Sequence, residues 1–157
     1  MTTIHRIDCG GEVTCVAWSL DGRYIAAGAD TGEVLIIDPT TRSIIKMAKS
    51  HRDAVNTMSF NRTSDKLVSG SADNTAIIHT VPDLTVLTTL KGHTDAIRCS
   101  LFLLDDRVIT GSADSTIRVW DAEGNAIHII KEHIRPVPTL SCSVARWYNT
   151  GEWRVGQ

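Results

Sequence analysis

The sequence predicts an all-β protein made of consecutive four-stranded antiparallel sheets. The strongest observation is an internal repeat of about 42 residues, which aligns residues 13–18 with residues 55–60 and 97–102. A second observation is that each repeat holds four short apolar runs separated by gaps of a few residues. Gaps this short favour antiparallel pairing, because a parallel crossover needs roughly a dozen residues. A third is that no segment shows a helical apolar period long enough to compete with the strands.

The third repeat shows its four strands most clearly. They are expected at residues 97–102, 107–110, 116–120 and 126–130, with turns at 104–106, 112–115 and 121–125. In the first repeat, Asp21-Gly22 stands between two apolar runs and is a strong hairpin signal. The repeats are placed at about residues 8–50, 51–92 and 93–132, with a partial fourth repeat at 133–157, all within a single domain of residues 1–157.

The faces of the strands predict how the sheets pack. The third strands, such as Val34–Ile37, are nearly continuous apolar runs, which indicates burial on both faces. In the first strand, Val16 and Trp18 form a bulky face while Cys15 and Ala17 form a smaller one. Unequal faces suit small sheets that converge around a common axis, as in a β-propeller. A flat solenoid is the alternative arrangement.

Composition limits the class of protein. The chain has 157 residues, 42% of them hydrophobic and 22% charged, as is typical of a soluble globular domain. A net charge of −2 gives no field to attract nucleic acid or an acidic membrane, and no apolar run is long enough to span one. The four cysteines form no zinc spacing, and Cys15 and Cys99 occupy the same buried strand position. We therefore expect a reducing compartment, the cytoplasm or alternatively the nucleus.

The third repeat carries a recognisable motif: Gly92-His93, then Thr110-Gly-Ser-Ala-Asp114, then Trp120-Asp121. It resembles the WD repeat of β-propellers. The resemblance implies a buried hydrogen-bonded network of His93, Thr110, Asp114 and Trp120, whose members satisfy one another. The second repeat matches with His51, Ser69 and Asp73, but has His79-Thr80 in place of Trp-Asp.

The first repeat departs further from the pattern. It keeps Asp30 but has Cys9, Ala27 and Ile37 where the His, the hydroxyl and the Trp would be. We therefore expect the first two units to be less rigid than the third. The fold that the resemblance implies is an arc of about three blades, with partial strands at both ends.

Three blades are too few to close the usual ring of seven. An open arc leaves an apolar blade face bare at each end, which predicts association. Three explanations are open: a fragment or shortened form of a longer propeller, a ring completed by a second copy, or a ring closed by a different chain.

The sequence offers no catalytic, metal or cofactor site. His51, His93 and His133 recur once per repeat, so they are expected in different blades and not around one ion. The aspartates Asp30, Asp73 and Asp114 are separated in the same way. No nucleophile elbow, P-loop or HExxH motif is present. We therefore expect a protein that is not an enzyme and has no cofactor.

The resemblance implies a platform for protein partners, formed by the loops that precede the first strand of each unit and those between the second and third strands. The expected contact residues are exposed polar side chains beside the network: Arg52, Asp53, Asn74, Asp95, Ser115 and Arg135. Other proteins are the expected partners, and nucleic acid and membranes are not. The alternatives are a subunit of an RNA-processing or other nucleic-acid assembly, an enzyme built on a propeller, and a truncated product without independent function.

Overall fold

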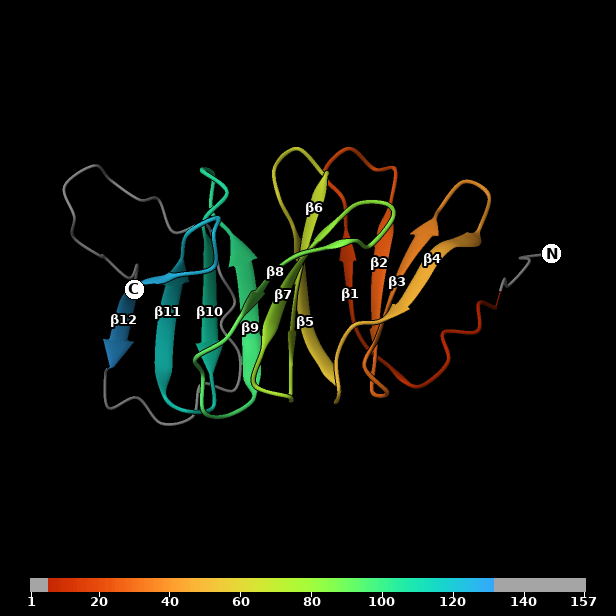
Figure 1. Ribbon diagram of the computed structural model, residues 1–157. Helices are drawn as coiled ribbons and strands as arrows, with labels where there is room; N and C mark the ends of the chain where they lie inside the picture. Colours follow the sequence, from red (N-terminus) through yellow and green to blue (C-terminus); the bar gives the residue numbers. More distant parts are fainter. Residues whose placement is uncertain (1–5, 132–157) are drawn as a thin grey trace, which may run out of the picture.

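The computed structural model describes residues 6–131, which form three four-stranded antiparallel sheets and contain no helix (Figure 1). Each sheet takes four consecutive strands in chain order. We call the sheets blades 1, 2 and 3. Blade 1 holds β1 (Val13–Trp18), β2 (Ile25–Ala29), β3 (Glu33–Asp38) and β4 (Ser43–Lys49). Blade 2 holds β5 (Val55–Phe60), β6 (Lys66–Ser71), β7 (Ala76–Thr80) and β8 (Val86–Leu90). Blade 3 holds β9 (Ile97–Phe102), β10 (Val108–Ser112), β11 (Thr116–Trp120) and β12 (Ala126–Lys131).

These sheets confirm the predicted all-β fold and its arc of three antiparallel blades. Some boundaries in the third repeat were wrong: the strand expected at residues 107–110 spans Val108–Ser112, so the turn expected at 112–115 begins one residue late, and the strand expected at 126–130 continues to Lys131. Ser112 pairs with Ile97 across a β-bulge, so the ladder extends past Gly111. Residues 6–12 contain no strand, and the partial fourth repeat at 133–157 lies outside the described residues.

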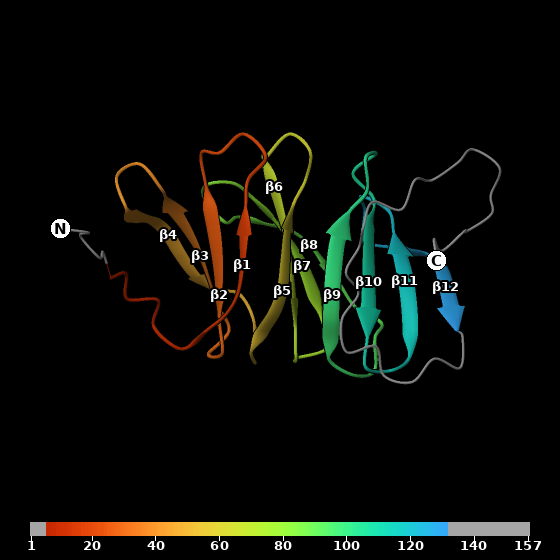
Figure 2. The same cartoon turned by 180° about the vertical axis from the view of Figure 1, so that it is seen from behind.

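The blades stand side by side with their first strands at the centre. The strands β1, β5 and β9 lie next to one another in both views, while β4, β8 and β12 lie at the far edges of their sheets (Figures 1 and 2). Each blade therefore has a leading face, turned toward the blade before it in the chain, and a trailing face, turned toward the next. Within residues 6–131, no helix has the length and apolarity needed to cross a membrane.

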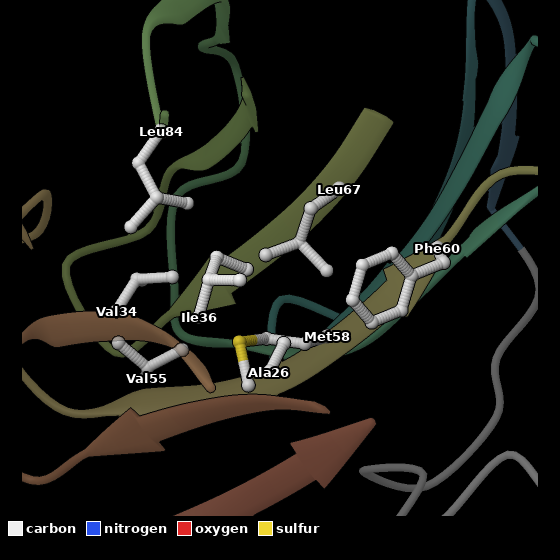
Figure 3. Packing of buried hydrophobic residues seen from close by; sticks show 8 residues of the cluster. All are labelled: Ala26, Val34, Ile36, Val55, Met58, Phe60, Leu67 and Leu84. Carbon is white, nitrogen blue, oxygen red and sulfur yellow. The ribbon is translucent and has the colours of Figure 1, made fainter. Parts of the chain in front are cut away.

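The hydrophobic core lies at the two seams between blades. At the first seam, Ala26, Val34 and Ile36 of blade 1 pack against the leading face of blade 2 (Figure 3). The blade 2 side of this cluster consists of Val55, Met58, Phe60, Leu67 and Leu84. The second seam repeats the arrangement, with Ile78 and Leu90 of blade 2 against Val108 and Trp120 of blade 3. Each blade thus buries apolar area against its neighbours, the dominant favourable contribution to folding.

Polar side chains join the same seams at equivalent positions. Thr14, the second residue of β1, donates a hydrogen bond to the Val55 carbonyl of the next inner strand. Asn56, the second residue of β5, donates through Nδ2 to the Ile97 carbonyl at 2.9 Å. These bonds satisfy carbonyls on strands that have no sheet partner on that side, as buried backbone groups require.

Glycine at a fixed position of the second strand lets the blades approach closely. A Cβ on Gly28 would lie 2.8 Å from both the Cys15 Sγ and the Val55 Cβ. A Cβ on Gly70 would lie 2.6 Å from the Ile97 Cγ2 and 2.8 Å from the Thr57 Cγ2. Because the same glycine faces the next inner strand at both seams, its role is to make room for that strand.

We predict that Gly70→Ala destabilises the protein by roughly 1–3 kcal/mol, because the added methyl overpacks the seam against Ile97. The measurement is the free energy of unfolding in a double-mutant cycle with Ile97→Ala, which removes the opposing methyl. The two changes should be strongly non-additive, with the glycine substitution costing much less in the Ile97→Ala background. Strict additivity would contradict the close-approach role.

Candidate functional site

The second blade contains a buried chain of four hydrogen-bonded side chains. His51, from the loop between β4 and β5, places Nδ1 3.0 Å from Asp73 Oδ2 and Nε2 2.8 Å from Ser69 Oγ. The Ser69 Oγ also lies 3.0 Å from the Nε2 of His79 on β7. The chain therefore ties the loop before the blade to its second strand, its third strand and the turn between them.

The third blade has the same chain with a different fourth member. His93 places Nδ1 2.7 Å from Asp114 Oδ2 and Nε2 2.8 Å from Thr110 Oγ1. Trp120 donates its indole Nε1–H to Thr110 Oγ1 at 2.8 Å. The structure thus brings together the four side chains that the WD resemblance selected in this repeat.

The aspartates are held by hydrogen bonds of their own. Oδ1 of Asp73 accepts from the Thr75 backbone N–H at 2.9 Å and from the Thr75 hydroxyl at 2.6 Å, and Oδ2 accepts from the Arg52 N–H at 3.0 Å. Asp114 receives the equivalent bonds from Thr116 and from the Thr94 N–H. Both carboxylates therefore stay fixed against the imidazole, and the backbone of the histidine loop is fixed with them.

The direction of each hydrogen bond follows from the donor capacity of the groups. An ionised carboxylate only accepts, so neutral His93 must carry its proton on Nδ1 and donate it to Asp114; its Nε2 then accepts from the Thr110 hydroxyl, which in turn accepts from the Trp120 indole N–H. In blade 2 the Ser69 hydroxyl donates to His51 Nε2 in the same way, so His79 carries its proton on Nε2 and donates it to Ser69. The Nδ1 atom of His79 is then a lone-pair acceptor; it is buried and has no hydrogen-bond partner within residues 6–131.

Burial sets the protonation of the network. It lowers the pKa values of His51 and His93 from their ordinary value, outweighing the aspartate that faces each ring. Burial, and secondarily the neighbouring His51, lowers the pKa of His79 to about 4. Burial alone would raise the pKa of Asp114, but hydrogen bonds from Thr116, His93 and the Thr94 N–H hold it well below its usual value. The network is thus neutral imidazole against ionised carboxylate at neutral pH.

The Asp73–His51–Ser69 order matches that of a serine-hydrolase triad, so access to solvent decides its chemistry. Ser69 is 0% exposed and His51 is 3% exposed. The Ser69 hydroxyl is also engaged by the His79 Nε2 at 3.0 Å. The arrangement braces the blade and cannot act on a substrate. Within residues 6–131, no group of His, Cys, Asp and Glu side chains has the geometry to hold a metal ion.

Blade 1 replaces the polar network with an apolar cluster. Cys9, Ala27 and Ile37 take the places of the imidazole, the hydroxyl and the indole, and they pack together with Ile7 and Leu35. Asp30, the one polar member kept, is exposed and accepts the Glu12 N–H at 2.9 Å. Exchanging all buried partners together leaves no donor or acceptor stranded, which is why such a replacement costs little.

The expected partner-binding residues of the described part of the chain lie on the loops before the first strands and between the second and third strands of blades 2 and 3, and these loops lie at the lower edge of Figure 1. Arg52, Asp53 and Asp95 are exposed, whereas Asn74 and Ser115 are half-buried. Asn74 and Ser115 occupy the left-handed region, with φ of 71° and 65°, at the turns beside the network aspartates. Arg135 lies outside the described residues. Hydrogen bonds from Ser71 to the Asp53 carbonyl and from Ser112 to the Asp95 carbonyl join each loop to its turn.

Comparison with known families matches this architecture. A model described as "WD domain, G-beta repeat" matches residues 84–121, and one described as "Anaphase-promoting complex subunit 4 WD40 domain" matches residues 2–63. The chain belongs to the WD-repeat β-propeller family. Its four-residue networks are therefore this chain's form of the WD-repeat motif.

Individual WD-repeat proteins and structures resemble the chain over most of its length. The U3 small nucleolar RNA-associated protein 15 homolog of Xenopus laevis is 30% identical over 80% of this chain and 25% of its own. A crystal structure of the mitotic checkpoint complex matches 84% of this chain and 41% of its own, with a TM-score of 0.77 and 26% identity. A crystal structure of RRP9 WD40 repeats matches 71% of this chain and 34% of its own, with a TM-score of 0.67 and 32% identity. The chain thus spans about a quarter of the length of such curated relatives.

Sequence reasoning missed three members of the WD-repeat networks. His79 was noted only as a departure from Trp-Asp, yet it bonds Ser69 in the position that Trp120 takes at Thr110. The sequence pattern assigns no role to Thr75 or Thr116, although each holds its aspartate with two bonds. The signal was present in the repeat: both threonines follow their aspartates at the same spacing, and His79 aligns with Trp120.

We predict that Thr110→Val lowers the free energy of unfolding by roughly 2 kcal/mol or more. The substitution keeps the shape of the side chain but strands both His93 Nε2 and the Trp120 N–H in a buried site. Chemical denaturation measures the loss. Thr89→Val, at a half-buried position on β8 outside the network, is the matched control and should be nearly neutral. Equal effects of the two substitutions would argue against the network.

We predict that His79 makes stability fall with acidification. The folded protein binds the His79 proton only near pH 4, whereas the unfolded chain binds it near the ordinary value of 6.5. The unfolded state thus binds more protons between these values, and stability falls as the pH drops through that window. The loss from pH 7 to pH 5 amounts to about 2 kcal/mol for this group.

His79→Gln isolates this contribution, because the Gln Nε2 can still donate to Ser69 but does not titrate. The difference between the unfolding free energies at pH 7 and pH 5 should be about 2 kcal/mol smaller in this variant than in the wild type. His128→Gln changes an exposed histidine on β12 and should keep the wild-type pH dependence. A His79→Gln variant with unaltered pH dependence would show that His79 is not the titrating group.

Proposed function

We propose that this WD-repeat chain is a non-catalytic scaffold that binds protein partners through the loops around the networks. One observation carries the proposal: the backbone of each histidine loop is bound by a half-buried aspartate, while Arg52, Asp53, Thr94 and Asp95 on these loops are exposed. The Arg52 N–H is bound by Asp73, and Arg52 itself is exposed. A loop whose backbone is already fixed loses little further backbone entropy when a partner binds it.

Both signs of charge stand on this surface. Arg52 and Asp53 are adjacent on one loop, and Asp95 lies on the corresponding loop of the next blade. Mixed charge suits a protein surface of complementary pattern, because it sets orientation and excludes wrong partners. The contact set proposed from the sequence, Arg52, Asp53, Asn74, Asp95, Ser115 and Arg135, is kept as the set to test.

A second candidate is a subunit of an RNA-processing assembly. The relative named for association with U3 small nucleolar RNA favours this candidate. The same relative makes doubtful the expectation that nucleic acid is not a partner. The same relative supports a nuclear location and gives no support to the cytoplasmic one that the cysteines suggested. A net charge of −2 favours entry into such an assembly through protein contacts over direct RNA binding.

We predict that the double charge reversal Arg52→Glu with Asp95→Lys removes most specific partners of the loop surface. Affinity purification of the full chain from nuclear extract, with quantitative mass spectrometry, measures the loss, expected to be several-fold or more per partner. Arg42→Glu reverses an exposed charge at the opposite end of blade 1 and should leave the partner set unchanged. An unchanged partner set in the double variant would contradict the proposed surface. Association that weakens steeply with salt and is abolished by ribonuclease would favour direct RNA binding instead.

A further inference from the structure

Arg118 is an unusual residue at the seam between blades 2 and 3. It lies on β11 directly opposite Thr110, the position that Leu35 occupies opposite Ala27 in blade 1 and Ile77 occupies opposite Ser69 in blade 2. Two repeats thus bury an aliphatic side chain where the third places a guanidinium. Within residues 6–131, no carboxylate forms an ion pair with Arg118.

Among the described residues, the guanidinium is held in place without a counter-charge. Its Cζ lies 5.9 Å from the centre of the Trp120 ring, a cation–π geometry. The Nε atom is buried without a hydrogen-bond partner in the described part of the chain. Arg118 as a whole is half-buried, so part of its side chain reaches solvent. A partly buried cation without a partner is costly, and an arriving carboxylate would offset that cost.

The backbone beside Arg118 is shaped to admit it. A Cβ on Gly92 would lie 2.4 Å from the Arg118 Nη1 and 3.4 Å from the Trp120 Cη2. Any other residue at this position would displace the guanidinium from its place over the indole. Gly92, at the start of the loop between β8 and β9, therefore forms one wall of the site, and Trp120 forms its floor.

Further cations and an apolar strip complete the surface. Ile129 stands directly opposite Arg118 on β12 and is 47% exposed. Lys131 lies two residues further on the same face, and exposed Lys91 precedes Gly92. Neither lysine has an ion-pair partner within residues 6–131. Three unpaired cations thus gather along the outer edge of one seam in a chain whose net charge is −2.

We propose that the outer edge of the seam between blades 2 and 3 binds an acidic segment of a partner protein, with a carboxylate on Arg118 and an adjoining aliphatic side chain on Ile129. The exposed isoleucine favours a peptide over a nucleic-acid strand, because the aromatic ring at the site, Trp120, is buried and offers no surface for base stacking. The site shares the start of the β8–β9 loop with the loop surface proposed above, but Arg118 and Ile129 are not among the contact residues proposed there, so either proposal can fail without the other.

The test uses the full chain and a fluorescein-labelled peptide of alternating Glu and Leu, with fluorescence anisotropy as the readout. The same peptide with Gln in place of Glu should bind at least about tenfold more weakly, because it lacks the charge-assisted bonds to Arg118. Arg118→Leu installs the residue that blade 1 carries. It should weaken binding of the Glu peptide by a similar factor while leaving the unfolding midpoint unchanged or raised. Arg62→Leu, at an exposed turn, should bind as the wild type does.

A second variant tests whether the loss of binding in Arg118→Leu is only a structural effect of that substitution. Ile129→Glu places a carboxylate of the chain itself opposite Arg118 and should also abolish binding. Met47→Glu is its matched control: Met47 stands opposite Leu35 in blade 1, is likewise 47% exposed, and should have no effect.

Four results would overturn the proposal. The first is equal binding of the Glu and Gln peptides, and the second is unaltered binding by both Arg118→Leu and Ile129→Glu. The third is tighter binding of a labelled oligouridylate than of the Glu peptide at equal salt, which would assign the site to phosphate. The fourth is tighter peptide binding by Glu132→Gln or Glu152→Gln, which would show that a carboxylate of this chain already occupies the site.

Discussion

The structure depends on one constraint: a four-stranded sheet this small cannot bury both of its faces by itself. Each seam solves the problem for two blades at once, with the smaller trailing face of one blade against the bulkier leading face of the next. The glycines Gly28 and Gly70 make the approach close enough for the inner strands to touch. The free energy gained by burying apolar surface does not depend on direction. Packing alone therefore does not fix the register of one blade on the next.

Register comes from polar groups placed at the seams. The Thr14 and Asn56 side chains bond carbonyls of the following inner strand, and each histidine network locks a connecting loop onto its blade. These networks tolerate change only as complete sets. Blade 2 exchanges indole for imidazole and keeps a donor at the same hydroxyl, while blade 1 exchanges every buried polar member for an apolar one. Both exchanges avoid a stranded polar atom, which would cost more than the bond itself contributes.

The repeat allowed much of this to be predicted from the sequence, because residues at equal positions meet equal surroundings. The strands β9 and β11 and the third-blade network residues lie where the pattern placed them. What escaped prediction was set by tertiary context. The left-handed turn residues recur in register as Gly32, Asn74 and Ser115, and of these residue types glycine and asparagine favour such a backbone whereas serine does not. The sequence places Arg118 on a strand but does not reveal its contacts with Trp120 and Gly92, which only the structure shows.

The same reasoning explains why stability differs along the arc. Met58 and Phe60 on the leading face of blade 2 are buried by blade 1, whereas the equivalent Val16 and Trp18 on blade 1 are 67% and 60% exposed. Within residues 6–131, blade 2 is therefore supported at two seams and blade 1 at one. Local opening is cheapest where the fewest apolar contacts are lost. Blade 1 compensates by laying Ile7 and Cys9 over its buried Leu35 and Ile37, which covers the middle of its leading face but leaves the inner strand bare.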